Sequence, residues 1–140
     1  MPIEILLVEH NLGDVRLTKE AFRATNKLIY IHTVSDGVQA MAFLSQKGAF
    51  AHAPRPDLIM LDLSLPVMDG RELLSLIKKD ERTCSIPIVV VTGSENEKDE
   101  AISFSNGADG YHKKPVRWEA FEALVKQMND FWIHQVDVHP

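Results

Sequence analysis

Short apolar runs alternate with longer amphipathic segments along the chain, and this alternation restricts the fold more than any other feature. Most of the runs are rich in Ile, Leu and Val, which is typical of strands buried on both faces of a parallel sheet. The segments between them carry apolar residues about one helical turn apart. The pattern predicts an α/β fold, a doubly wound five-stranded parallel sheet with five helices. The expected strands are residues 3–8, 28–34, 58–61, 86–91 and 110–112, and the expected helices are residues 14–26, 38–46, 71–79, 97–105 and 118–132.

The composition fits one soluble domain. The chain has 140 residues, and 45% of them are hydrophobic, which is enough for a single core. Its net charge of −5 repels nucleic-acid phosphates, so we expect no nucleic-acid partner. The N-terminal sequence lacks the features of a signal peptide, and no apolar run is long enough to cross a bilayer. We therefore expect a cytoplasmic protein that does not associate with membranes.

Polar residues follow four of the expected strands at the point where each apolar run ends. Ligands of an open parallel sheet bind at the carboxyl ends of its strands, where the strand order reverses. We therefore expect these side chains to converge at one edge of the sheet. They are Glu9 and His10 after the first strand, Asp62 after the third, Thr92 after the fourth and Lys114 just beyond the fifth.

These residue types suit phosphoryl transfer. The carboxylate of Asp62 can attack phosphorus and form an acyl phosphate. A divalent cation offsets the negative charge at such a site, and hard oxygen ligands suit Mg²⁺. The Thr92 hydroxyl can donate to one phosphoryl oxygen, while Lys114 supplies positive charge to another. This chemistry needs little beyond positioning and charge stabilisation.

Four sequence pieces in this order, ILLVEHN, DLIMLDLSLPVMDG, IPIVVVTGSE and GADGYHKKP, resemble those of bacterial response-regulator receiver domains. The resemblance covers nearly the whole chain and implies a flavodoxin-like sheet with strand order 2-1-3-4-5. Asp62 matches the phosphoacceptor and Thr92 the switch hydroxyl. Lys114 matches the lysine before a cis-prone proline, here Pro115, and Tyr111 matches the switch aromatic.

The resemblance also implies a signalling role and partners. A sensor histidine kinase would transfer its phosphoryl group to Asp62, and the altered surface around the fourth helix, fifth strand and fifth helix would then meet a downstream protein target or phosphotransfer protein. The domain would be no enzyme beyond its own phosphorylation and dephosphorylation at Asp62. The residues two positions after Asp62 and Thr92, which tune those rates in the family, are Ser64 and Ser94.

A narrower resemblance is to the stand-alone receivers of phytochrome-type histidine kinases. It is carried by GDVRLTKEAF, DGVQAMAFL, DGRELL and the ending DFWIHQVDVHP, although KKP replaces the KS of several group members. It implies one receiver domain over residues 1–140, with residues 131–140 as an extension used for homodimerisation. Phe131, Trp132 and Ile133 are therefore interface candidates. The spacing of Trp118 and Trp132, close to four helical turns, favours a shared core-facing stripe for Trp118.

Position ten departs from the family pattern, which places two acids after the first strand. Here the pair is Glu9-His10, so a nitrogen ligand that Mg²⁺ binds poorly replaces a hard anion. One interpretation is weak Mg²⁺ binding through Glu9, Asp62, water and the backbone carbonyl of Leu63 or Ser64. The other is a site that prefers Mn²⁺ or another transition metal, or holds none. His10 itself is a doubtful ligand, because a histidine in a loop before a helix is usually solvated.

Asp14 lies one helical turn from His10, and the sequence does not fix the direction in which its side chain points. The missing acid also leaves an alternative function open. This is a pseudo-receiver, a phosphorylation-independent interaction module with a degenerate metal site. Two enzyme classes on similar folds fit poorly. A haloacid-dehalogenase-type phosphatase needs an aspartate at position 64, which is Ser64, and a dinucleotide-binding enzyme needs a glycine-rich turn that VEHNLGD lacks.

Overall fold

Five parallel strands form one sheet in the order β2-β1-β3-β4-β5. The structure is a computed structural model that describes residues 2–25 and 27–133. The observed order and the parallel pairing confirm the predicted fold. The strands are β1 (Ile3–Val8), β2 (Ile29–Val34), β3 (Leu58–Leu61), β4 (Ile88–Thr92) and β5 (Gly110–Lys113).

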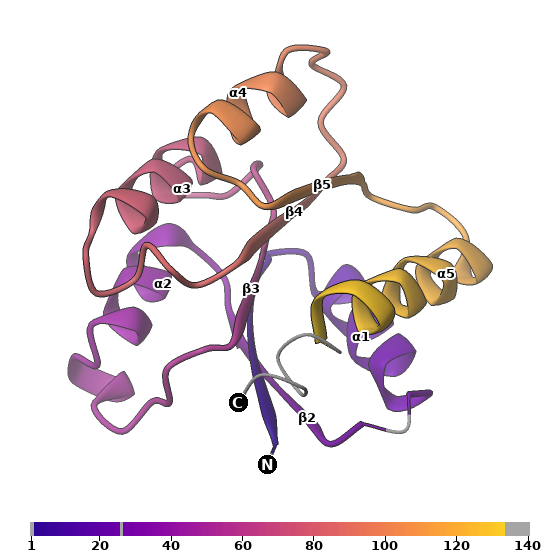
Figure 1. The fold of residues 1–140 in the computed structure, drawn as a ribbon, viewed down its shortest axis with the longest axis horizontal. Helices are drawn as coiled ribbons and strands as arrows, with labels where there is room; N and C mark the ends of the chain where they lie inside the picture. The colour runs from indigo at the N-terminus through magenta and orange to yellow at the C-terminus, as the bar shows by residue number, and fades with distance from the viewer. Residues whose placement is uncertain (1, 26, 134–140) are drawn as a thin grey trace.

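Helices cover both faces of this sheet. In Figure 1, α1 and α5 lie together on one side, whereas α2 and α3 lie on the other and α4 stands beside the β4–β5 end. This arrangement follows from the βαβ connections, each of which returns the chain to the same edge of the sheet. The helices are α1 (Leu12–Arg23), α2 (Gly37–Leu44), α3 (Gly70–Lys79), α4 (Asp99–Ser105) and α5 (Trp118–Met128).

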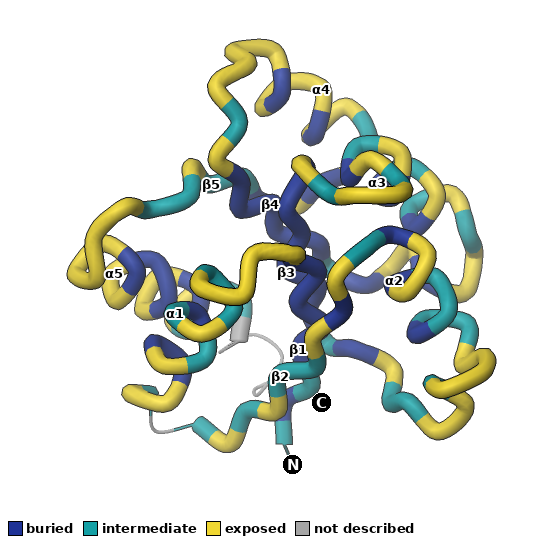
Figure 2. The backbone as a smooth tube through the Cα atoms, turned by 180° about the vertical axis from the view of Figure 1, so that it is seen from behind, coloured by how far each residue is buried: buried dark blue, intermediate teal, exposed yellow. Residues whose placement is uncertain are grey.

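The strands divide the core into two layers because successive side chains point to opposite faces. On β1, Ile5 and Leu7 pack with α1 and α5, while Leu6 and Val8 pack with α2 and α3. The central strands β1, β3 and β4 are therefore buried almost along their whole length, as the dark tube in Figure 2 shows. The residues that follow the carboxyl ends of these strands are therefore attached to a rigid part of the fold.

The helix boundaries differ from the predicted ones where caps intervene. Helix α1 begins at Leu12, two residues earlier than expected, because the Asn11 side chain accepts a hydrogen bond from Asp14 N at 3.0 Å. The last helix is not continuous to residue 132. It ends at Met128, and the chain continues as one π-helical turn, Asn129–Ile133. Between α2 and β3, Gly48–Phe50 forms a short 3-10 turn.

The fourth strand starts at Ile88 rather than at residue 86. Ile86 is buried in the core, so it belongs to the apolar run, but its backbone N–H closes a turn to Thr83 O. Burial and strand pairing therefore begin at different residues. The peptide bond before Pro115, which the resemblance marks as cis-prone, is trans.

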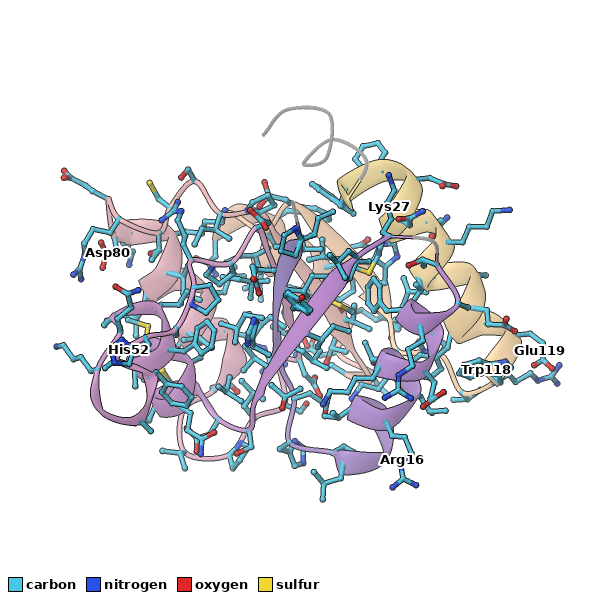
Figure 3. All side chains as sticks on the ribbon, turned by 90° about the horizontal axis from the view of Figure 1, so that it is seen from below. Arg16, Lys27, His52, Asp80, Trp118 and Glu119 are labelled. Carbon is cyan, nitrogen blue, oxygen red and sulfur yellow. The ribbon has the colours of Figure 1, made fainter. Side chains whose placement is uncertain are left out.

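The position of Trp118 also differs from the predicted one. It does not share a core-facing stripe with Trp132, because 39% of its surface is exposed and it projects outward at the start of α5 (Figure 3). Trp132 instead packs against the α1–α5 core layer. Among the described residues, the structure contains no helix that is long and apolar enough to cross a membrane.

Candidate functional site

The sheet's own hydrogen-bond pattern positions the polar residues at its carboxyl edge. The N–H of Glu9 donates to Val34 O at 3.0 Å, and the N–H of Asp62 donates to Val8 O at 3.1 Å. The N–H of Lys114 donates to Thr92 O at 2.8 Å. Each residue thus continues the pairing just past its strand. Glu9 and Asp62 flank the point between β1 and β3 where the strand order reverses.

Lys114 joins three carboxylates in one cluster. Its Nζ lies 2.9 Å from Glu9 Oε2, 2.8 Å from Asp14 Oδ2 and 2.9 Å from Asp62 Oδ2. An ammonium group has three N–H donors, so each donor has its own carboxylate. Asp14 reaches the cluster from the first turn of α1. The sequence did not show the direction of this side chain, and the structure gives it a place in the site.

The other oxygen of Asp62 accepts two neutral hydrogen bonds. Thr92 Oγ1 donates to Oδ1 at 2.9 Å, and the backbone N–H of Ser64 donates to the same atom at 3.1 Å. Asp62 is only 4% exposed, and Thr92 is fully buried. The predicted residues Glu9, Asp62, Thr92 and Lys114 therefore do converge, with the carboxylate of Asp62 at their centre.

These contacts set the charge state of the cluster. Burial acts to raise the pKa of Asp62, but hydrogen bonds from Lys114, Ser64 and Thr92 outweigh it and hold that pKa below its ordinary value. Burial dominates at Glu9 and raises the pKa of this carboxyl despite hydrogen bonds from Lys114 and Asn11. Burial acts to lower the pKa of Lys114, yet its bonds to Asp14, Glu9 and Asp62 leave it raised.

A divalent cation fits beside this cluster. One ligand atom each from Glu9, His10 and Asp62 lies within 4.8 Å of the others. His10 is half exposed, and its Nδ1 is 3.9 Å from Glu9 Oε1. Two carboxylate oxygens and an imidazole nitrogen form a mixed donor set, which suits Mn²⁺ and similar metals better than Mg²⁺. The structure therefore brings His10 to the acids, as the sequence order suggested.

The loop after Asp62 folds back against it. Gly70 begins α3 so close to this loop that an added Cβ would lie 2.4 Å from Asp62 O and 2.5 Å from Leu63 Cα. Between them, Met68 N donates to Pro66 O at 2.7 Å, which closes a γ-turn around Val67 at a φ of 70°. Only glycine fits at position 70, and the tight loop fixes the backbone that carries Asp62.

Tyr111 lies outside the carboxylate cluster. It is half-buried on β5 and packs against the α2–α3 core layer. Burial, followed by the negative charges of Asp99 and Glu100, raises the pKa of its phenol. Phe131 and Trp132 lie beyond α5 and take no part in the cluster, while the Ile133 side chain and residues 134–140 lie outside the described residues.

A buried ion pair beside the site was not foreseen from the sequence. Asp99, which is 1% exposed, accepts hydrogen bonds from Arg71 and from the Ser94 hydroxyl. An acidic residue in the first turn of a helix is common and usually solvated. Its burial depends on how α3 and α4 approach each other, which a single sequence does not reveal.

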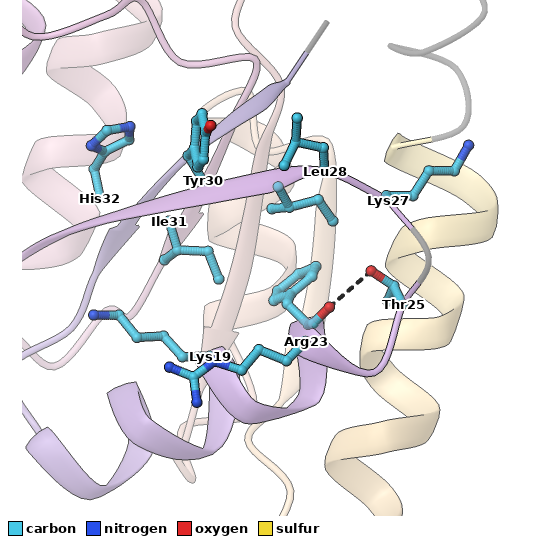
Figure 4. Close-up of a pocket in the computed structure, with 10 residues that line it drawn as sticks. Lys19, Arg23, Thr25, Lys27, Leu28, Tyr30, Ile31 and His32 are labelled. Carbon is cyan, nitrogen blue, oxygen red and sulfur yellow. Dashed lines mark hydrogen bonds between the residues drawn. The ribbon is translucent and has the colours of Figure 1, made fainter.

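A second surface feature of the described residues is a groove that lies away from this site. It has a volume of about 480 Å³ and follows the edge strand β2 beside α1, with Lys19, Tyr30 and His32 among its lining residues (Figure 4). The Thr25 hydroxyl donates to Phe22 O at 2.8 Å at its rim. The groove shares no lining residue with the carboxylate cluster, so its size is no guide to the chemistry.

The pKa shifts predict how the cluster responds to pH. The lowered pKa of Asp62 means that its stabilising contribution is present above its unfolded value of about 3.9 and is lost as pH falls. The raised pKa of Lys114 means that its contribution is present below about 10.4 and is lost only as pH rises through the higher folded value. The raised pKa of Glu9 acts oppositely to that of Asp62 and favours lower pH.

Replacing Lys114 with Met should therefore destabilise the protein in a pH-dependent way. At pH 7 we expect a loss of about 2 kcal/mol, because the buried carboxylates lose their charged donor. The loss should shrink as pH falls through the acid range, where Glu9, with its raised pKa, takes up a proton before Asp62, whose pKa is lowered. Urea unfolding between pH 3.5 and pH 8 measures it, with Lys79→Met, an exposed lysine on α3, as control. A loss that is the same at every pH would contradict this account.

Comparison with known proteins extends these observations. The sequence matches the response regulator receiver domain family over residues 5–126. The response regulator Rcp1 of Synechocystis sp. is 38% identical over 135 residues, which cover 96% of this chain and 92% of that protein.

Solved structures agree with this relationship. The phosphorylated cyanobacterial phytochrome response regulator RcpA is 41% identical, covers 95% of both chains and has a TM-score of 0.90. The Mn²⁺-bound form of Rcp1 is 39% identical, covers 94% of both chains and has a TM-score of 0.88. The chain therefore belongs to the response regulator receiver family, and it is a two-component signalling protein whose relatives include the phytochrome-associated response regulators Rcp1 and RcpA.

Proposed function

We propose that Asp62 is the phosphoacceptor of this response regulator and that a sensor histidine kinase, of the phytochrome type, is its phosphoryl donor. The observation that carries this proposal is the arrangement of donors around one buried carboxylate. Lys114 donates a hydrogen bond to one carboxylate oxygen of Asp62, and Thr92 donates a hydrogen bond to the other. The similarity to RcpA, a cyanobacterial phytochrome response regulator, supports the kinase class.

The transfer step follows from this geometry. A carboxylate oxygen of Asp62 attacks the phosphorus of a phosphohistidine, so that an O–P bond forms while the P–N bond breaks. The imidazole leaves with the bonding electron pair and takes a proton from water. Lys114 shifts one N–H from Asp62 to a phosphoryl oxygen, while Glu9 and Asp14 retain its other two donors. Thr92 donates its hydroxyl hydrogen to a second phosphoryl oxygen.

A bound divalent cation would supply positive charge that offsets the carboxylates and the phosphoryl oxygens. Glu9 and Asp62 would hold it, together with the backbone carbonyl of Leu63 or Ser64 and, for a transition metal, His10. The chemistry is confined to phosphorylation and dephosphorylation at Asp62, and the output passes through contacts with a downstream target or phosphotransfer protein.

Phosphorylation of Asp62 can be tested directly. Acetyl phosphate with Mg²⁺ or Mn²⁺, or a histidine kinase that carries a phosphoryl group, should add one phosphoryl group to the protein by intact-mass measurement. Asp62→Asn should take up none, whereas Asp130→Asn, an exposed acid beyond α5, should behave as the wild type. If the wild type takes up no phosphoryl group with either metal, the phosphorylation-independent pseudo-receiver becomes the better description.

His10 should determine which metal the site prefers. His10→Asp restores a hard anionic ligand, so we expect the Kd for Mg²⁺ to fall about tenfold while the Kd for Mn²⁺ changes less. Isothermal titration calorimetry measures both constants. His52→Asp, an exposed position on the far loop, adds the same charge away from the site and serves as the control. Equal Mg²⁺ affinity in wild type and His10→Asp would show that His10 does not determine the metal preference.

The end of α5 is the proposed homodimer interface of a receiver domain spanning residues 1–140, with residues 131–140 as its extension. Phe131 is 59% exposed and stands edge-on against Trp132, with ring centroids 5.0 Å apart. Both residues border an apolar cavity of about 300 Å³ on β5. An exposed aromatic side chain beside an apolar cavity favours burial against a second copy.

Phe131→Glu should weaken this dimer, because it places a charge in the apolar contact. Sedimentation velocity should show at least a tenfold increase in the dimer dissociation constant. Val38→Glu changes an apolar residue of similar exposure on α2, on the opposite face of the sheet, and should leave the dissociation constant unchanged. Equal dissociation constants for Phe131→Glu and wild type would place the interface elsewhere.

A further inference from the structure

A partly buried ion pair ties the beginning of α4 to the beginning of α3, with Asp99 buried and Arg71 about one third exposed. Arg71 donates from Nε to Asp99 Oδ1 at 2.8 Å and from Nη2 to Asp99 Oδ2 at 2.6 Å. Asp99 is 1% exposed, and this bidentate pair holds the pKa of its carboxyl below the ordinary value. Arg71 also contacts Asp69, the residue that caps α3 directly before Gly70. The pair is therefore anchored to the loop that carries Asp62.

Ser94 connects this ion pair to the phosphoacceptor. Its hydroxyl donates to Asp99 Oδ2, and its backbone N–H donates to Thr92 Oγ1 at 3.3 Å. Thr92 Oγ1 in turn donates to Asp62 Oδ1 at 2.9 Å. A continuous set of hydrogen bonds thus runs from Asp62 to Arg71. We call Ser94, Asp99 and Arg71 the Asp99 linkage.

We infer that the Asp99 linkage couples phosphorylation of Asp62 to the position of α4, with Asp99 and Arg71 as positioning residues. The inference rests on the proposed function of Asp62. Its physical basis is that Thr92 has a single hydroxyl hydrogen. To donate that hydrogen to a phosphoryl oxygen in place of Asp62 Oδ1, the Thr92 side chain has to turn about its Cα–Cβ bond, and this displaces the Oγ1 atom that accepts from Ser94 N–H. Ser94 must follow or lose the bond.

The ion pair determines what else moves. A buried carboxylate that loses its partners carries a large desolvation cost, so Asp99 should keep Arg71 and Ser94 as the loop shifts. The loop and the first turn of α4 then move together about Arg71, which α3 holds. Helix α4 has only seven residues, so its first turn is a large part of it. Its outer side chains Ile102 and Phe104 are 40% and 47% exposed, so a partner protein that contacts them would sense a movement of α4.

The test uses Ser94→Ala, which removes only the hydroxyl that joins the loop to Asp99. The reporter is the ¹⁵N–¹H signal of Arg71 Nε, together with the backbone amide signals of α4, before and after loading with acetyl phosphate. Intact mass measures loading on the same samples. Ser105→Ala removes the same atom from an exposed position on α4 and is the matched control. Asp99→Asn, which keeps the side-chain shape but removes the charge, is a second variant that interrupts the Asp99 linkage.

In the wild type and in Ser105→Ala, loading should shift the Arg71 Nε signal and the α4 amides. In Ser94→Ala and Asp99→Asn, the shift at these positions should fall at least twofold when samples are compared at the same phosphoryl loading, as measured by intact mass. A loaded wild type whose Arg71 signal stays fixed, or a Ser94→Ala variant with the full shift, would overturn the inference and leave the phosphoacceptor role intact. A wild type that takes up no phosphoryl group would overturn the proposed function and the inference with it.

Discussion

The site depends on the ion pairs made by the ammonium group of Lys114. Three carboxylates, those of Glu9, Asp14 and Asp62, meet at the carboxyl edge of the sheet, and one cation contacts all of them. Without it, like charges in a poorly solvated place would repel one another and favour protonation. With it, Asp62 stays ionised and therefore nucleophilic. Under the proposed function, the same ammonium group would also meet a phosphoryl oxygen.

The sheet makes this arrangement inexpensive in conformational terms. Each participating residue lies at or directly after the end of a buried strand, and its backbone is held by the pairing of its neighbours. The tight loop from Asp62 to Gly70 and the capped start of α1 fix the remaining positions. Preorganised charges require little rearrangement when charge develops, which is what the proposed phosphoryl transfer needs.

At position ten, a histidine changes the donor atoms that this edge of the sheet offers to a metal, while the strand order of the family is kept. His10 occupies the place of an acid, and the structure keeps its ring near Glu9 and Asp62. Asp14 supplies a third carboxylate to the cluster. It contacts Lys114 and does not belong to the group of Glu9, His10 and Asp62 that could hold a metal. The negative charge of the site is therefore largely retained, while the set of metal ligands becomes softer.

The sequence alone determined the fold class, the strand order implied by the family resemblance and the four residues that converge, because apolar periodicity and chain order specify which residues end each strand. Helix ends and the start of β4 needed the structure, since caps and turns such as those of Asn11 and Ile86 compete locally with the apolar pattern. Tertiary packing alone decided the direction of Asp14, the outward position of Trp118 and the burial of Asp99. Each of these depends on how separate elements approach one another in space, and spacing along the chain does not encode that distance.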